Sequence, residues 1–310
     1  MGDYPKKRVA LLVTTLGSFV TPFMGSSINV ALPSMGKEFA MDVILMNWVA
    51  MSFLLTAAAF LVPFGRVADL YGRKRVFVYG LIVYTIFSLL SATSTSPILI
   101  VFYRAFQGVG GAMIFATAAA ILTSVFPIGE RGRALGINAA SIYLGLSLGP
   151  SLGGFMTQNL GWRSLFILNA LVGLTAIIVI FWKLDGEWAE AKGERFDLIG
   201  SMVYGSMLVA LMYGTSLLPY ELGLFLTLIG VLGLMVFIVW ESRTKSPVIN
   251  ISLFRKNLTF AFSNLAALIN YSATFAVGYL LSLYLQNVKG LSPQDAGMIL
   301  LTQPAVMAIF

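Results

Sequence analysis

Residues 136–154 read GINAASIYLGLSLGPSLGG, a stretch in which glycine recurs at helical spacing. Gly145, Gly149 and Gly153 follow one another every four residues, so in an α-helix they form a strip without side chains along one face. Small residues at this spacing let two helix backbones approach closely inside a membrane, and Pro150 bends the helix because it has no N–H. The full set is Gly136, Gly145, Gly149, Pro150, Gly153 and Gly154. Ordinary helix packing explains one glycine pair but not this set, so the stretch predicts a bent helix suited to close backbone contact.

The composition places this helix in a lipid bilayer. Hydrophobic residues make up 58% of the 310 residues and charged residues 11%, whereas soluble domains carry about 25% charged and about 45–50% apolar residues. The mean hydropathy of +0.87 is too high for a protein that covers itself with water. We therefore expect an all-α polytopic membrane protein, and the composition excludes soluble enzymes, nucleic-acid binders and disordered scaffolds.

The sequence contains no Cys and no His. Disulfide bonds, thiolate metal sites and cysteine nucleophiles are therefore excluded, and so are imidazole acid–base chemistry and the commonest zinc ligand. Since the apolar segments also lack paired carboxylates, we expect neither an enzyme nor a bound metal or cofactor. The net charge of +7 is better explained by basic membrane loops than by nucleic-acid binding.

Ten apolar segments have the character of transmembrane helices, each of which needs about 20 residues. They lie near residues 9–32, 45–64, 76–95, 98–122, 134–157, 164–183, 198–218, 222–240, 260–286 and 293–310. The helical interpretation follows because irregular backbone cannot face lipid. The last segment is still apolar at Phe310, so we expect these 310 residues to be a C-terminally truncated part of a longer protein.

Basic residues are distributed unequally between the two sides of these spans. Sixteen Lys and Arg residues lie on the side of the N-terminus, and three, Lys37, Arg163 and Lys289, lie in the opposite loops. Because basic residues concentrate on the cytoplasmic side, we expect a multi-pass plasma-membrane protein with a cytoplasmic N-terminus. No small-residue cleavage site follows the short basic start, so the first helix is expected to be a retained span.

Two polar connections divide the chain. The first, LDGEWAEAKGERFD at 184–197, follows six predicted spans, and the second, ESRTKSPVINISLFRKN at 241–257, follows two more. We therefore expect three parts, since halves of six helices are common among polytopic membrane proteins. They are an N-terminal six-helix bundle (1–184), a charged linker with a two-helix insert (185–245) and an incomplete C-terminal bundle of about two helices (246–310).

The predicted loop after the second span reads GRVADLYGRKR at residues 65–75. Its carboxylate can pair with an arginine or with a helix N-terminus, giving a contact that forms in one conformation and breaks in another. Membrane topology alone accounts for the basic residues but not for the acid between two glycines. We call the set Gly65, Asp69, Gly72, Arg73 and Arg75 the latch.

An arginine and a glutamine share one face of the fourth predicted span, within RAFQGVGG at residues 104–111. An arginine at the bilayer centre costs at least about 2.5–3.5 kcal/mol, so we expect Arg104 and Gln107 to face a wet cavity or a polar partner. The alternative is that Arg104 extends to the outer interface, since it lies about two turns into the helix. In the first span, Asn29 contacts either a bound molecule or a neighbouring helix, and we favour the helix.

Further strings accompany these motifs: SSINVALP at 26–33, NW at 47–48, WR at 162–163, RFD at 195–197 and LYLQ at 283–286. Together with the latch, the arginine of the fourth span and the glycine–proline helix, they resemble the major facilitator superfamily. Within it they are similar to the fourteen-helix drug:proton antiporters, and the resemblance extends over essentially the whole chain.

The resemblance implies alternating access, with a cavity for a small-molecule substrate between two six-helix bundles. It further implies proton-driven efflux of drug-like or amphipathic molecules by a protein that works as a monomer when full length. By the same resemblance, Asp69, Gly72 and Arg73 belong to the latch, Arg104 and Gln107 to coupling, and Gly149-Pro150 to the antiporter gate helix. Two alternatives remain open: an exporter of one metabolite or siderophore on the same fold, and a non-transporting remnant.

The sequence departs from the antiporter pattern in its charges. Met24 stands where many of these antiporters carry an acid, and Leu70 stands where an arginine often follows the latch aspartate. All thirteen acidic residues fall at or near the predicted loops, so the residue that carries the proton is not identified. Without a fixed negative charge, a cationic substrate would depend on aromatic faces, which Phe23, Phe106 and Tyr143 are candidates to supply.

Overall fold

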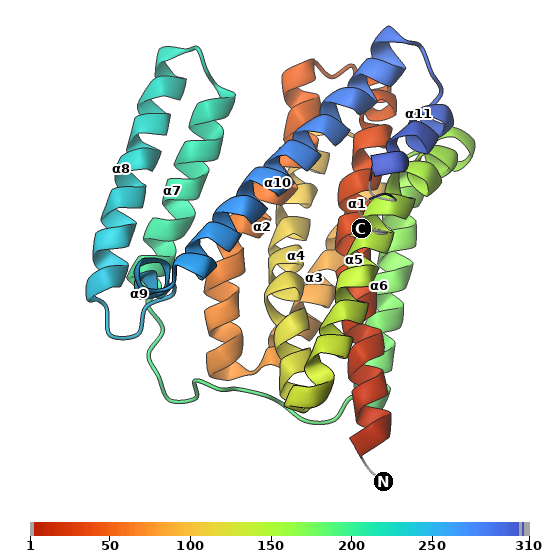
Figure 1. The fold of residues 1–310 in the computed structure, drawn as a ribbon. Helices are drawn as coiled ribbons and strands as arrows, with labels where there is room; N and C mark the ends of the chain where they lie inside the picture. The colour runs from red at the N-terminus through yellow and green to blue at the C-terminus, as the bar shows by residue number, and fades with distance from the viewer. Residues whose placement is uncertain (1–2, 304–305, 307–310) are drawn as a thin grey trace.

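The computed structural model describes residues 3–303 and Val306, and the regular elements of that part are all helical (Figure 1). They are α1 (Asp3–Phe39), α2 (Val43–Tyr71), α3 (Arg73–Ala92), α4 (Pro97–Val125), α5 (Ile128–Leu160), α6 (Arg163–Lys183), α7 (Leu198–Ser216), α8 (Glu221–Arg243), α9 (Ile251–Lys256), α10 (Leu258–Leu283), the π-helical turn η1 (Tyr284–Val288) and α11 (Pro293–Leu300). Within these residues, nine helices have the length and apolar character needed to cross a membrane. The prediction of an all-α polytopic membrane protein is confirmed. The predicted tenth span begins as α11, and much of the rest of it lies outside the described residues.

Several helices begin where a polar side chain accepts a bond from a free backbone N–H. Asp42 accepts from the Leu45 N–H at 2.7 Å to start α2, and Asn257 accepts from the Phe260 N–H at 3.0 Å to start α10. Ser96 caps α4 in the same way, with a proline at the first helical position, where its missing N–H costs no bond. These caps set the boundaries of helices whose interiors are almost entirely apolar.

The first six helices pack into one bundle. α1 contacts α4, α5 and α6, while α4 also packs against α2 and α3, and α3 packs against α6. The hairpin of α7 and α8 packs on α2, and the segment 184–197 runs to it along the end of the bundle that carries the N-terminus (Figure 1). α10 crosses diagonally to the opposite end, which we call the distal end, and α11 lies there against α5.

Glycines hold α3 and α4 in contact. Gly80 and Gly110 face each other across the two helices, beside the buried side chains of Tyr84 and Ile114. A Cβ on Gly110 would lie 2.6 Å from the Tyr84 nitrogen and 2.8 Å from the Gly80 oxygen, and both of these are backbone atoms. The two helices can therefore approach this closely only while position 110 lacks a side chain.

The structure corrects two sequence predictions. Residues 65–71 of the latch are not in a loop but form the last turns of α2, and Gly72 alone separates α2 from α3. Gly72 has a φ of 125°, a backbone conformation that glycine adopts without strain. The second connection, 241–257, is also partly helical, because it contains the end of α8 and the short helix α9.

We expect Gly110→Ala to lower the free energy of unfolding by about 1–3 kcal/mol, because its methyl group must push the α3 and α4 backbones apart. Gly278→Ala in α10 is the matched control, since its Cβ would meet no described atom within 4 Å and alanine favours a helix. Thermal unfolding of the purified protein in detergent measures both changes. Equal unfolding temperatures for the two variants would contradict the close-packing explanation.

Candidate functional site

The glycine strip of α5 packs against α1. A Cβ on Gly145 would lie 2.6 Å from the Phe19 oxygen, and one on Gly153 would lie 2.8 Å from the Ser27 Cβ. Between them, a Cβ on Gly149 would overlap Ser26. Three consecutive turns of α5 therefore touch α1 at the level of the backbone, as the four-residue spacing predicts.

Two serines of α1 add hydrogen bonds to this contact. The Ser27 hydroxyl donates to the Gly149 carbonyl at 3.0 Å, and the Ser26 hydroxyl donates to the Gly145 carbonyl at 3.4 Å. Gly136 does not take part, because it is exposed and its Cβ would meet no described atom within 4 Å. The close-packed strip therefore begins at Gly145, and a role of Gly136 in the gate helix stays a prediction.

At the distal end, the chain after α9 closes over α1. The Ser282 hydroxyl donates to the Asn29 carbonyl at 2.8 Å, and the Gln286 amide donates to the Val30 carbonyl at 3.1 Å. Pro33 explains why the first of these carbonyls needs an outside donor, since proline lacks the N–H that would bond to the residue four positions earlier. A proline inside α1 thus leaves free the acceptor for a contact from α10.

The contact of Asn29 with a neighbouring helix is made by its backbone carbonyl. Its side-chain Oδ1 is buried and has no hydrogen-bond partner among the described residues. The sequence predicted a bridging side chain at this position, and the structure instead places the bridge on the main chain of the same residue.

The backbones of α5 and α11 also meet at the distal end. A Cβ on Gly154 would overlap the Pro293 carbonyl, and a Cβ on Gly297 would overlap the Pro150 carbonyl. One glycine from each helix therefore makes room for the other helix. We call the contacts of Asn29, Val30, Gly154, Ser282, Gln286 and Gly297 the distal seal.

Arg104 is buried inside the six-helix bundle. It is 1% exposed, and its Nε donates to the Val49 carbonyl at 3.1 Å. Its Nη1 donates to Gln107 Oε1 at 2.6 Å, and Gln107 donates in turn to the Ser88 hydroxyl at 2.7 Å. The guanidinium lies 4.5 Å from the centre of the Phe53 ring, a distance at which the ring face attracts a cation. Arg104 therefore turns inward to polar partners, and the alternative of an interfacial arginine is wrong.

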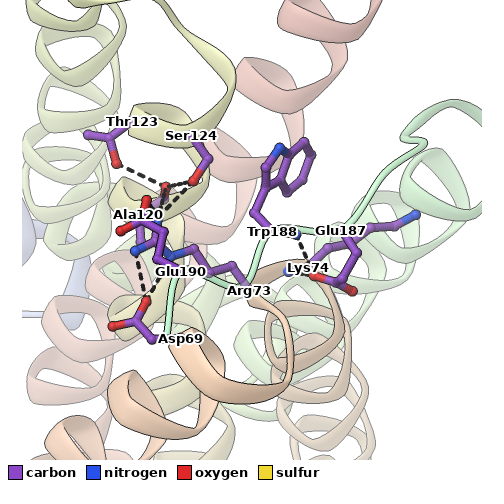
Figure 2. Close-up of polar contacts among 9 residues, drawn as sticks. All are labelled: Asp69, Arg73, Lys74, Ala120, Thr123, Ser124, Glu187, Trp188 and Glu190. Atoms are coloured by element: carbon purple, nitrogen blue, oxygen red, sulfur yellow. Dashed lines mark hydrogen bonds and ion pairs between the residues drawn. The ribbon is translucent and has the colours of Figure 1, made fainter. Parts of the chain in front are cut away.

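The latch closes around Arg73. Arg73 Nη2 lies 2.7 Å from Asp69 Oδ1, and its Nη1 donates to the Ser124 hydroxyl and to Glu190, each at 2.7 Å (Figure 2). Nη1 also donates to the Ala120 carbonyl at 3.2 Å. One guanidinium thus joins the end of α2, the end of α4 and the segment 184–197.

The segment 184–197, which we call the linker, lies along the latch. Glu187 accepts from the backbone N–H groups of Lys74 and Arg75 at 2.8 and 3.2 Å, so it caps the first turn of α3. Glu194 pairs with Arg66 at 2.6 Å. The backbone takes part as well, since the Arg73 N–H donates to the Trp188 carbonyl at 2.8 Å.

Sequence reasoning treated the linker only as a boundary and missed its acids. Glu187, Glu190 and Glu194 recur at intervals of three and four residues, opposite the basic run of the latch. This complementary spacing is the signal that was available.

Within the latch, Gly65 has no tight contact, since its Cβ would lie 3.8 Å from Ala116, whereas a Cβ on Gly72 would overlap the Glu187 carboxyl group.

The three aromatic candidates lie in different settings. Phe23 is 1% exposed and stacks on Phe19 with ring centres 5.4 Å apart, so it is a packing residue. Phe106 stacks on Phe87 at 4.8 Å. Tyr143 of α5 interacts with Tyr271 of α10 through their side chains, which places it between the six-helix bundle and the later part of the chain.

These features define a helical membrane protein in which later helices close over one end of a six-helix bundle. The chain belongs to the Major Facilitator Superfamily, whose family model matches residues 14–310.

Its relatives are named as transporters and resistance proteins. The chain is 28% identical over 307 residues to the riboflavin transporter RibZ of Clostridioides difficile, covering 98% of this chain and 66% of that protein. It is 29% identical over 308 residues to the multidrug resistance protein Stp of Mycobacterium tuberculosis, covering 97% of this chain and 57% of that protein. The family and these relatives support a transporter and not an enzyme.

The fold is also that of a solved transporter. A crystal structure of the peptide transporter POT in complex with alafosfalin aligns with a TM-score of 0.66 at 18% sequence identity, covering 96% of this chain and 65% of that one. The chain therefore spans about two thirds or less of the length of the proteins it matches.

A single thiol can report whether the linker is attached, because the sequence has no Cys. Ala191 is 8% exposed and its N–H donates to the Asp69 carbonyl, so the Cys in Ala191→Cys should react slowly with a maleimide. Changing Glu187, Glu190 and Glu194 together to Gln should raise that rate about tenfold. Their three ion pairs, with Arg75, Arg73 and Arg66 in that order, are then lost, at about 0.5 kcal/mol each.

Lys245→Cys provides the control, because Lys245 is exposed and lies outside the linker. Its labelling should be fast with or without the three linker acids. An Ala191→Cys rate that does not change when the acids are neutralised would show that the linker is held by something other than these pairs.

Proposed function

We propose that the chain is part of a secondary-active exporter of the fourteen-helix antiporter branch, which moves drug-like or amphipathic small molecules by alternating access. The observation that carries the proposal is the distal seal. Helices α10 and α11 meet α1 and α5 there through backbone atoms, whereas apart from these contacts α10 is mostly exposed along its length, with Leu258 67%, Leu268 63% and Leu280 62% accessible. Contact at one end only is the geometry expected of a transporter that is closed on one side and open on the other.

The distribution of basic residues supports an orientation for this state. With the N-terminus in the cytoplasm, the distal seal faces the outside of the plasma membrane and the latch and linker face the cytoplasm. The described arrangement then corresponds to the state open to the cytoplasm, from which an exporter takes up its substrate. The latch holds α2, α4 and the linker together on that side.

A largely apolar binding surface with a few polar groups fits an amphipathic substrate. Tyr143 and Tyr271 are the pair we assign to it, since an aromatic ring offers an apolar face and its hydroxyl a hydrogen bond. Met24 is fully buried where many of these antiporters have an acid, so the first span offers no charge to select cations. The similarity to a multidrug resistance protein supports this choice.

The similarity to a riboflavin transporter favours a second candidate, in which one metabolite is carried on the same fold. Growth-inhibition tests with a panel of dyes and antibiotics separate the two. Protection against several unrelated compounds supports the multidrug function, and protection against none of them, together with transport of one metabolite, supports the second candidate. No transport in any assay would favour the remnant.

We assign coupling to Arg104 with Gln107, and we propose a proton as the coupling ion. The buried arginine is held by neutral oxygens and a ring, and no carboxylate is among the partners that the structure describes for it. The guanidinium has no opposite charge among these partners, and the protein interior has a low dielectric constant. Its electrostatic energy therefore changes strongly when a negative charge or a proton comes near. Coupling then acts through a difference in stability between the two access states.

We expect Arg104→Ala to reduce gradient-driven efflux from proteoliposomes about tenfold or more, because charge-assisted hydrogen bonds worth about 1.5–3 kcal/mol each are removed. Arg133→Ala is the control, since Arg133 is an exposed residue of α5, and it should keep the normal rate. Both variants must insert into the membrane in equal amounts. Normal efflux by Arg104→Ala would exclude the coupling role.

A further inference from the structure

Two carboxyl groups meet where the α7–α8 hairpin joins the rest of the chain. Asp197 caps α7, because its Oδ1 accepts from the Gly200 N–H at 2.9 Å, and its Oδ2 accepts from Trp240 Nε1 at 2.9 Å. Glu241 lies in the last turn of α8 and is only 2% exposed. Its Oε2 accepts from the Ile249 N–H at 2.8 Å, so Glu241 also fixes the segment that leads to α10.

The second oxygen of Glu241 points at Asp197. A Cβ on Gly200 would overlap Glu241 Oε1 and would lie 2.5 Å from Asp197 Oδ2, so both oxygens lie over the same glycine. The two carboxyl groups therefore lie close together. Yet Oε1 is buried and has no donor among the described residues. Two ionised carboxylates in this position would repel each other, and the buried one would also lose its hydration. An unpaired buried oxygen would be unfavourable as well.

We propose that Asp197 and Glu241 form a proton-binding site, in which Glu241 carries one proton on Oε1 and donates it in a hydrogen bond to Oδ2 of Asp197. The proton is the one missing component, since Oε2 of Glu241 and both oxygens of Asp197 already accept from N–H groups. A hard metal cation such as Ca²⁺ takes 6–8 oxygen ligands. No group of three or more acidic residues that could hold a metal ion occurs in the described part of the chain, so a metal fits less well.

The other charged groups near the two carboxyl groups do not replace the proton on Glu241. Asp197 lies beside Glu241 over Gly200. Glu194 in the linker is paired with Arg66. The basic residues of the adjoining segments are exposed: Arg195, Arg243, Lys245, Arg255 and Lys256.

The proton joins three segments of the chain. It ties the start of α7 to the end of α8, and through the Ile249 N–H it ties both to the connection before α10. Loss of the proton would set two negative charges against each other at this junction. The site contains none of the residues assigned to transport above, so it can be tested independently of the proposed function.

Infrared spectroscopy and thermal unfolding of the purified protein test the site. At neutral pH the wild type should show the carbonyl band of a protonated carboxyl group, and Glu241→Gln should lack it. The glutamine amide can donate to Asp197 while its oxygen still accepts from Ile249, so this variant keeps the hydrogen bonds and loses only the titrating proton.

The pH dependence of stability provides the second readout. Because the folded protein holds a proton that the unfolded chain releases, the wild type should lose stability as the pH rises, by up to about tenfold in the folding equilibrium per pH unit. Glu241→Gln should lack this loss over the same range. The control Glu221→Gln, which changes an exposed acid of α8, should keep the wild-type profile, and replacing Na⁺ and K⁺ with choline should leave it unchanged.

Parallel pH profiles for the wild type and Glu241→Gln would overturn the proposal, as would a profile that follows the metal-ion concentration. Should Glu241→Gln not fold, the wild-type spectrum decides, because the absence of a protonated carboxyl band at neutral pH contradicts the site on its own.

Discussion

The arrangement of this protein depends on backbone-to-backbone contact between helices that lack side chains where they meet. In a bilayer, apolar side chains gain little by leaving lipid for protein, so helices associate through close packing and hydrogen bonds. α5 meets α1 at Gly145, Gly149 and Gly153, and it meets α11 at Gly154. The same helix thus serves as the contact surface for the six-helix bundle and for the later part of the chain.

A small number of polar contacts strengthens this close packing. Pro33 frees a carbonyl of α1, and Ser282 of α10 takes it up. Arg104 is surrounded by neutral acceptors and a ring, and Arg73 joins two helices to the linker. Because these contacts are few, they can break in one transition. A protein that changes between two stable arrangements needs such contacts.

The sequence was sufficient for the properties that depend on composition and periodicity. Hydropathy identified the spans, and the four-residue spacing in α5 identified the helix face that packs on α1. It was insufficient where tertiary contacts determine the local structure. The end of α2 appeared to be a loop because its residues are polar, yet the linker acids neutralise Arg66 and Arg73 and let the helix continue to Tyr71.

Other features depend on residues far apart in the chain. The acceptor role of the Asn29 carbonyl requires both Pro33 and a donor more than 250 positions later. Glu241 seemed to be an ordinary loop acid, and only its position over Gly200, beside Asp197, sets it apart. Spacing within one segment carries no information about such partners.

We propose that the distal seal opens when the opposite end of the bundle closes. Spin labels measure this directly in the Cys-free chain. One pair, at Leu160→Cys and Lys289→Cys, spans the distal end, and another, at Ile128→Cys and Leu258→Cys, spans the end that carries the N-terminus; all four positions are exposed. When the transmembrane proton gradient is reversed, we expect one distance to lengthen while the other shortens. Two distances that stay fixed, or that change in the same direction, would contradict it.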